Sequence, residues 1–288
     1  MSGMNNRLGI LLMCLTTFVF AMQDGISRYM ASEYNAYLVV MIRYWFFAAF
    51  VVALSARRPG GLKKAVKTKH LWLQVFRGAL LAAEIVVTVV SFTLLGLTET
   101  HAIFICYPLM IAALSGPILG ESVGWRRWAA IGVGLIGVLI ILQPGYGVFS
   151  PAAIVPIVGA LMFAVYGLAT RYVATDDGSA VSFFYTGTVG MVCMTAVGVF
   201  FWEPIIGTDW YWMITLCITG VLGHWLLIKT YDHAEASAVQ PFAYLQLPFA
   251  SALGIFAFGE TLRTNVAIGA AIIVAAGLFT LWRERQAG

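Results

Sequence analysis

Long apolar runs recur along the whole sequence, and they constrain the fold more than any other feature. Each run approaches the roughly 20 residues that an α-helix needs to cross about 30 Å of hydrocarbon. The runs are continuously apolar, which favours helices over the alternating strands of a membrane barrel. With 61% hydrophobic and 10% charged residues, the chain is predicted to be an all-α integral membrane protein. Ten transmembrane helices are predicted, at about residues 8–29, 36–55, 71–95, 100–119, 127–143, 151–173, 180–202, 210–230, 237–257 and 264–282.

The sequence also contains an internal repeat. Residues 20–31 are FAMQDGISRYMA, and residues 163–174, 143 positions later, are FAVYGLATRYVA. A Gly-Glu pair followed by a hydroxyl residue occurs at 120–122 and again 139 positions later, at 259–261. Two echoes in the same order predict two copies of one unit, residues 1–145 and 146–288, with five helices each. Because five crossings are an odd number, the copies would be inverted repeats, a hallmark of secondary transporters.

The basic residues predict an orientation in the membrane. If the N-terminus is cytoplasmic, 13 of the 17 Lys and Arg residues fall on the inner side, two fall on the outer side, and Arg43 and Arg77 lie within spans. The positive-inside rule therefore predicts a multi-pass protein of the cell (inner) membrane with both termini cytoplasmic. The net charge of +4 reflects this topology and forms no patch for a nucleic acid. The expected partners are the lipid bilayer and a small-molecule substrate; the oligomeric state stays open.

Both halves carry motifs of a known family. In the second half these are Gly220 to Trp225, Tyr231, Ala236-Ser237-Ala238, Pro241, Pro248 and Gly259-Glu260; in the first half they are Thr98, Ala102, Pro108, Gly120-Glu121, Gly132, Gly134 and Gly137. In these motifs the chain resembles the EamA domain of the drug/metabolite transporter superfamily, twice. The resemblance implies a basket of ten helices around a central cavity and gradient-driven export of small metabolites, often amino acids. Among the branches, the chain is most similar to the YddG-type aromatic amino acid exporters.

Four ionisable residues lie inside predicted spans: Asp24, Arg43, Arg77 and Glu84. Each costs about 2.5 to 3.5 kcal/mol at the membrane centre, so each needs a partner, a wet cavity or a function. Arg77 and Glu84 are two helical turns apart, and Asp24 and Arg28 are one turn apart, so pairing within a helix is one interpretation. The other is that Asp24 and Glu84 face a cavity and exchange protons, which makes them the proton-coupling candidates.

A second group of polar-tipped or aromatic residues lies near the span centres and breaks. Aromatic rings can hold a substrate ring, although helix packing and interface belts use the same residues. The predicted substrate cavity comprises Gln23, Asp24, Glu84, His101, Tyr107, Tyr166, His224, Trp225, Tyr244 and Gln246. Prolines inside predicted spans are either hinges or simple kinks; the hinge candidates are Pro108, Pro241 and Pro248.

The predicted function is a secondary active transporter that exports amino acids, aromatic ones included, and related small metabolites by alternating access. Alternatives are an exporter of cationic drugs or other metabolites in the same superfamily, or a membrane-embedded enzyme or sensor. The sequence lacks a Walker-type phosphate-binding motif and an H-E-x-x-H motif. We therefore predict no enzymatic activity, no cofactor and no metal.

Overall fold

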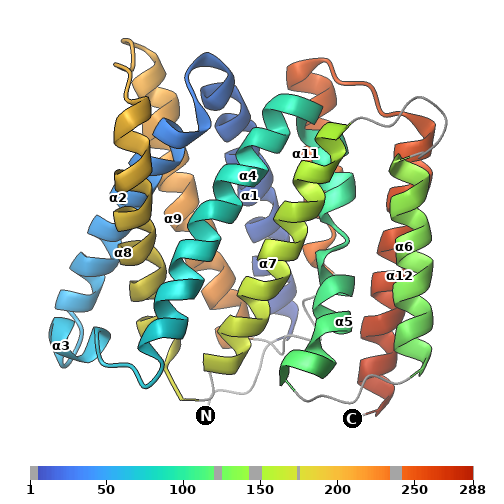
Figure 1. Cartoon of the computed structure of the whole chain (residues 1–288), viewed down its shortest axis with the longest axis horizontal. Helices are drawn as coiled ribbons and strands as arrows, with labels where there is room; N and C mark the ends of the chain where they lie inside the picture. The colour runs from blue at the N-terminus through green and yellow to red at the C-terminus, as the bar shows by residue number, and fades with distance from the viewer. Residues whose placement is uncertain (1–5, 120–124, 143–150, 174–175, 234–241, 288) are drawn as a thin grey trace.

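The computed structural model describes residues 6–119, 125–142, 151–173, 176–233 and 242–287. These residues form helices and their connections, without a strand in the described part. The helices stand side by side in one bundle, and the two ends of the chain lie at the same end of it (Figure 1). They are α1 (Asn6–Glu33), α2 (Ala36–Ala56), α3 (Gly61–Ala65), α4 (Leu71–Phe104), α5 (Tyr107–Leu119), α6 (Trp125–Leu142), η1 (Pro151–Ala153), α7 (Ile154–Val173), α8 (Ser179–Gly198), η2 (Val199–Phe201), α9 (Asp209–His233), α11 (Gln246–Phe258) and α12 (Thr264–Ala287).

Six of these helices are long and apolar enough to cross a membrane: α1, α2, α4, α7, α8 and α9. Shorter apolar helices, of 10 to 17 residues, lie within α5, α6, α11 and α12. The predicted all-helical membrane class is thereby confirmed. The exact number of ten spans stays a prediction, because six helices in the described part of the chain meet the length and hydropathy of a membrane span.

The predicted fourth span, 100–119, is wrong as a single helix. Helix α4 continues past the predicted end of the third span and bends at Gly96, whose φ of 80° and ψ of 177° are not helical. Glycine tolerates this positive φ because it lacks a Cβ atom. The residues after Gly96 form a short second part of α4, which ends at Phe104, and α5 begins only at Tyr107. Two half-helices therefore stand where one span was predicted.

The second half of the chain has a matching break. The structure places the start of α11 at Gln246, inside the predicted ninth span, after a turn at residues 244–245. Helices α5 and α11 both contain 13 residues. They start 139 positions apart, which is the offset of the two Gly-Glu motifs. Pro108 and Pro248 each lie in the first turn of their half-helix, where a missing N–H removes no intrahelical hydrogen bond. Pro108 and Pro248 therefore lie at the starts of helices. The third hinge candidate, Pro241, lies outside the described residues.

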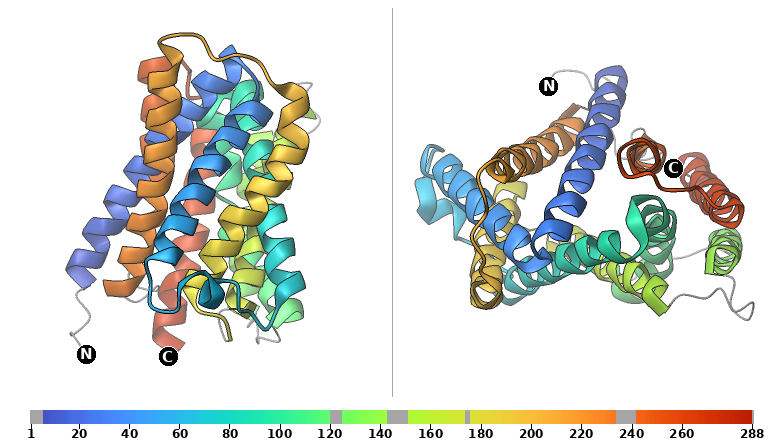
Figure 2. Two further views of the ribbon diagram at one scale, coloured as in Figure 1. Left: turned by 90° about the vertical axis from the view of Figure 1, so that its left-hand side faces the viewer. Right: turned by 90° about the horizontal axis from the view of Figure 1, so that it is seen from above.

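The helices of the two predicted repeats interlock. The most extensive interhelical contacts join α1 with α9, α4 with α7, α2 with α8 and α6 with α12. Each pair takes one helix from each half of the chain, so neither half packs as a separate body. Seen from above, α1 crosses the interior between α9, α4 and α11, and it contacts all three (Figure 2). Residues on α1 are therefore placed to meet both halves.

At one end of the bundle, the carboxylate of Glu260 closes the break in α4. It accepts hydrogen bonds from the backbone N–H groups of Leu97 (2.7 Å) and Thr98 (2.9 Å), and it pairs with the guanidinium of Arg28. The bend at Gly96 exposes these N–H groups as the start of a new helical segment, and a carboxylate stabilises such a start by accepting their hydrogen bonds. Glu260 thus joins α1 and α4 to the connection between α11 and α12.

At the opposite end, Asp177 ties the connection between α7 and α8 to the start of α4. This buried carboxylate accepts hydrogen bonds from the Thr68 hydroxyl, from the backbone N–H of Lys69 (3.2 Å) and from the side-chain amide of Gln74 (2.8 Å). Burial raises the pKa of Asp177, but the hydrogen bonds outweigh it, so the pKa lies below its usual range. The carboxylate therefore stays ionised at neutral pH.

The neighbouring Asp176 predicts a pH dependence of stability. Hydrogen bonds from the Lys69 ammonium (2.7 Å) and the His70 imidazole (2.9 Å) lower the pKa of Asp176 to about 2. Because the folded pKa is depressed, its contribution is present above the ordinary value of 3.8 and is lost as the pH falls towards 2. We expect Asp176→Asn to lower the melting temperature slightly at pH 7. Between pH 4 and pH 2, the melting temperature of this variant should fall less than that of the wild-type protein. Melting curves of both proteins in detergent measure this; parallel pH profiles would contradict it.

Candidate functional site

One face of α1 organises the interior of the protein. Phe20, Gln23, Asp24 and Ser27 follow the spacing of three and four residues that places side chains on the same side of a helix. Phe20 and Gln23 face α9, Asp24 faces α4 and α11, and Ser27 faces α2. The stripe belongs to the repeated segment 20–31, so the internal repeat and the interior site coincide in the sequence.

Three charged side chains come together in this interior: Asp24 on α1, Arg43 on α2 and Glu84 on α4. They are close enough to interact electrostatically with one another. Arg43 donates a hydrogen bond of 3.3 Å to the hydroxyl of Ser27, and within the described part of the chain this is its one hydrogen bond. A guanidinium carries five N–H donors, so Arg43 retains donors for a ligand.

Glu84 is 4% exposed and accepts a hydrogen bond of 2.7 Å from the hydroxyl of Thr88, one turn along α4. The predicted pairing of Glu84 with Arg77 is wrong. Arg77 is 1% exposed and donates instead to Gln74, to the Thr170 hydroxyl (2.8 Å) and to the Tyr166 hydroxyl (3.4 Å). Its long side chain reaches the polar groups at the end of the bundle and thereby leaves Glu84 free to face Arg43.

The predicted pairing of Asp24 with Arg28 is wrong as well, because Arg28 pairs with Glu260. Asp24 instead accepts a hydrogen bond of 3.0 Å from the side-chain amide of Gln246 on α11. The same carboxylate oxygen lies 3.2 Å from Nε2 of His101 on α4, without the alignment of a hydrogen bond. Asp24 therefore connects α1 to both broken regions, one from each half of the chain.

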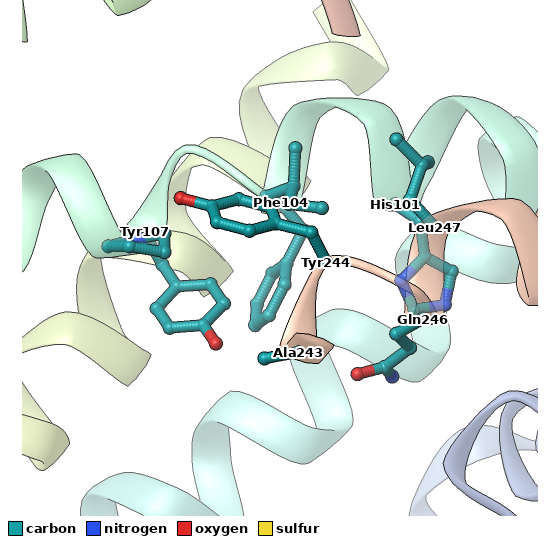
Figure 3. Close-up of a pocket in the computed structure, with 9 residues that line it drawn as sticks. His101, Phe104, Tyr107, Ala243, Tyr244, Gln246 and Leu247 are labelled. Atoms are coloured by element: carbon teal, nitrogen blue, oxygen red, sulfur yellow. The ribbon is translucent and has the colours of Figure 1, made fainter. Parts of the chain in front are cut away.

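A first cavity lies where these broken regions meet (Figure 3). His101 and Gln246 lie together at one side, and the rings of Phe104, Tyr107 and Tyr244 lie at the other. The cavity encloses about 370 Å³ of empty space, part of it open to the surroundings. Its lining residues are His101, Phe104, Ile105, Tyr107, Pro108, Ala243, Tyr244, Gln246 and Leu247.

A second cavity lies next to Arg43 between α2, α4 and α9, with about 390 Å³ of empty space, part of it open to the surroundings. One wall is aromatic: the imidazole of His224 stacks on the ring of Phe47, with centroids 5.6 Å apart and planes at 13°. Phe20 and Phe183 meet the same imidazole edge-on. A planar stack beside a cation with free donors suits a ligand that carries both a ring and a carboxylate. The lining residues are Arg43, Tyr44, Phe47, Leu81, Ile85, Leu216, Cys217, Gly220, Val221 and His224.

The predicted cavity residues separate into groups. His101, Tyr107, Tyr244 and Gln246 line the first cavity, and His224 lines the second. Gln23, Asp24 and Glu84 lie beside the two cavities, whereas Tyr166 packs against Arg77. Trp225 is 47% exposed and lines neither cavity. Sequence reasoning missed Phe20, Ser27 and Phe47; the helical spacing of Phe20 and Ser27 relative to Asp24 was the available signal.

Comparison with known proteins now gives this geometry a context. Residues 7–143 and 150–282 each match the EamA-like transporter family. The S-adenosylmethionine uptake transporter of Rickettsia prowazekii is 25% identical over 96% of this chain and 94% of its own length. The riboflavin transporter of Vibrio cholerae is 26% identical over the same shares, and a pseudopaline exporter of Pseudomonas aeruginosa is 20% identical over 93% and 94%.

A solved crystal structure shares the fold at a TM-score of 0.63, with 17% identity over 98% of this chain and 97% of the other. The family match covers nearly the whole sequence, in two successive segments, and the described structure is a helical bundle with membrane-spanning helices. The chain is a multi-pass membrane protein, and it belongs to the EamA-like transporter family.

Proposed function

We propose that this chain is a secondary transporter of a zwitterionic metabolite that carries an aromatic ring, with S-adenosylmethionine as the first candidate. The observation that carries the proposal is Arg43, a cation inside the bundle that keeps unused donors beside a cavity. Donors of a charged group that stay unused inside a membrane protein are costly, which supports a binding site at this arginine.

The charges of S-adenosylmethionine match those around Arg43. The ligand has one carboxylate and two cations, an ammonium and a sulfonium. Arg43 would bind the carboxylate in the two-pronged manner of arginine, and Asp24 and Glu84 would face the cations. The stacked rings of His224 and Phe47 would hold the adenine. Riboflavin is uncharged, and it would bring no carboxylate to Arg43 and no cation to Asp24 and Glu84.

Export of free aromatic amino acids is the second candidate. It is favoured by the same two features, the charges that fit an amino-acid head and the aromatic wall that fits a side-chain ring. The two candidates differ in direction, since relatives are named as uptake transporters, whereas the resemblance in the sequence implied export. We propose uptake for the adenosylated substrate.

The experiment is counterflow of labelled S-adenosylmethionine in proteoliposomes of the full chain. We expect accumulation that is inhibited by excess unlabelled S-adenosylmethionine and S-adenosylhomocysteine, and not by riboflavin or a quaternary ammonium compound. Counterflow of labelled phenylalanine, with none of labelled S-adenosylmethionine, would support the second candidate instead. Inhibition by riboflavin alone, or absence of counterflow with every labelled compound, would refute the charge argument.

The proposal includes the inner membrane and cytoplasmic termini. The connection that carries Lys67 and the connection that carries Thr208 lie at opposite ends of the bundle. A cysteine at Thr208 should react with an impermeant maleimide in intact cells, and a cysteine at Lys67 only after permeabilisation, in a background where the four native cysteines are replaced. The reverse pattern would invert the orientation.

A further inference from the structure

Gln23 is a buried amide with an unused acceptor. The residue is 6% exposed, and its Oε1 atom has no hydrogen-bond partner within the described residues. Buried polar atoms in proteins nearly always have a partner, so each exception needs an explanation. Nothing in the charge arrangement around Arg43 uses this amide.

The neighbours of Gln23 place it beside the aromatic wall. Across from it on α9 lies Gly220, which lines the second cavity; a Cβ atom there would meet Oε1 of Gln23 at 3.2 Å. One turn further along α9 is His224, which stacks on Phe47. Because Gly220 has no side chain, the Gln23 amide packs closely against α9 beside a residue that lines the second cavity.

The head-group site is one turn away on the same helix. Ser27 follows Gln23 by four residues, a rise of about 6 Å along α1, and its hydroxyl accepts the hydrogen bond from Arg43. Along one face of α1, the amide of Gln23 therefore lies near the aromatic stack, and one turn further Ser27 binds Arg43 of α2, which can bind a carboxylate. A ligand with a heterocycle at one end and an amino-acid group at the other fits this order.

We propose that Gln23 binds the amino edge of the adenine ring of an adenosylated substrate. A glutamine amide is complementary to that edge, because its oxygen accepts from the exocyclic amine while its NH₂ group donates to N7. The unused Oε1 supplies the acceptor, and His224 with Phe47 holds the ring face. This inference rests on the proposed function and adds to it the residue that selects the base.

The edge contact explains how the site would separate adenosylated compounds from other zwitterions. The ring of a free aromatic amino acid such as phenylalanine offers no donor and acceptor pair to an amide. A hypoxanthine ring has the shape of adenine but presents a carbonyl oxygen where adenine has its amine. In the orientation observed for Gln23, two oxygens would then face each other, and a site built to bond an NH₂ group rejects an analogue that lacks it.

The test compares two ligands that differ at this edge alone, S-adenosylhomocysteine and its deaminated form, S-inosylhomocysteine. We expect purified wild-type protein to bind the adenosyl compound more tightly by on the order of 10-fold. Gln23→Met keeps the length of the side chain and removes the amide. It should weaken binding of the adenosyl compound and thereby bring the ratio of the two affinities close to one. Thr17→Val is the matched control, since Thr17 is a buried polar residue on α1 that bonds its own helix and lines neither cavity. It should keep the wild-type ratio.

Gly220→Ala gives an independent variant if Gln23→Met does not fold, because the added methyl group would press on the Gln23 oxygen and displace the amide. A ratio that stays at the wild-type value in the folded variants would overturn the role of Gln23, while binding of the adenosyl compound by wild-type protein would leave the proposed function standing. Absence of any adenosyl binding by wild-type protein would instead overturn the proposed function and this inference with it.

Discussion

Arg43→Gln should abolish transport while the protein still folds. Among the described residues Arg43 gives one hydrogen bond, to Ser27, and its side chain lines the second cavity. Loss of one partner of a buried charge pair costs about 2–5 kcal/mol of binding, so affinity should fall roughly 30-fold or more. Binding is measured by titration calorimetry, and folding by the melting temperature in detergent.

Arg77→Gln is the matched comparison, because Arg77 is also an arginine inside a predicted span but has its donors occupied. It bonds Gln74, Thr170 and Tyr166, and its guanidinium lies over the Tyr166 ring. Its removal leaves polar side chains of three residues without this donor, at about 1–3 kcal/mol each, so the protein should be destabilised by about 3–5 kcal/mol and the melting temperature should fall by on the order of 10 °C. The protein that remains folded should bind substrate normally. If Arg43→Gln melts early and Arg77→Gln only loses binding, the two roles are reversed.

The second large effect is expected for Glu260→Ala. This change leaves the N–H groups of Leu97 and Thr98 without their acceptor and leaves Arg28 unpaired. Each unsatisfied buried group costs about 1–3 kcal/mol, so the free energy of unfolding should fall by about 3–5 kcal/mol. Glu260→Gln should cost less, because its carbonyl oxygen can still accept from one N–H group. Melting temperatures of the two variants in detergent give the comparison.

Arg28→Met separates the stabilisation that comes from the backbone hydrogen bonds to Glu260 from the stabilisation that comes from its ion pair with Arg28. It removes the cation but leaves the hydrogen bonds from Leu97 and Thr98 to Glu260 intact, so it should destabilise much less than Glu260→Ala. Equal losses in both variants would mean that the ion pair, and not the capping of the second part of α4, stabilises this end of the bundle. Gly96→Ala provides a further check at the same place: an alanine there would be strained at a φ of 80° and would collide with the Glu260 carboxylate.

The candidate site was predictable from sequence in its residue types and only partly in its arrangement. Asp24, His101 and Gln246 were expected to lie at a cavity, and the structure brings these three together from α1, α4 and α11. The reason is that polar residues inside apolar spans are costly, so their presence alone marks an interior position. Trp225 was placed in the cavity for its aromatic ring, yet its side chain is 47% exposed. An aromatic ring is equally stable against lipid, so its type does not reveal its direction.

The ion pairs show where local reasoning stops. Arg77 with Glu84 and Asp24 with Arg28 have the spacing of helical pairs, but Arg77 bonds Thr170 and Tyr166 on α7 as well as Gln74, and Arg28 pairs with Glu260 in the connection after α11. An interhelical partner that is itself buried and already needs a hydrogen bond outcompetes a neighbour on the same helix, whose pairing contributes only about 0.2–0.5 kcal/mol. The spacing of residues in the sequence indicates only the weaker pairing within one helix, because it gives no information on the distance to another helix.

The sequence by itself determined the helical membrane class and the repeat, because the length of an apolar run and the recurrence of a motif are local properties of the chain. The tertiary structure decided three things that depend on residues far apart: the break in α4 at Gly96, its closure by Glu260, and the free donors of Arg43 beside the aromatic stack. A glycine in an apolar run is compatible with a straight helix. It becomes a break only because a carboxylate from a segment more than 160 positions away satisfies the N–H groups that the bend exposes.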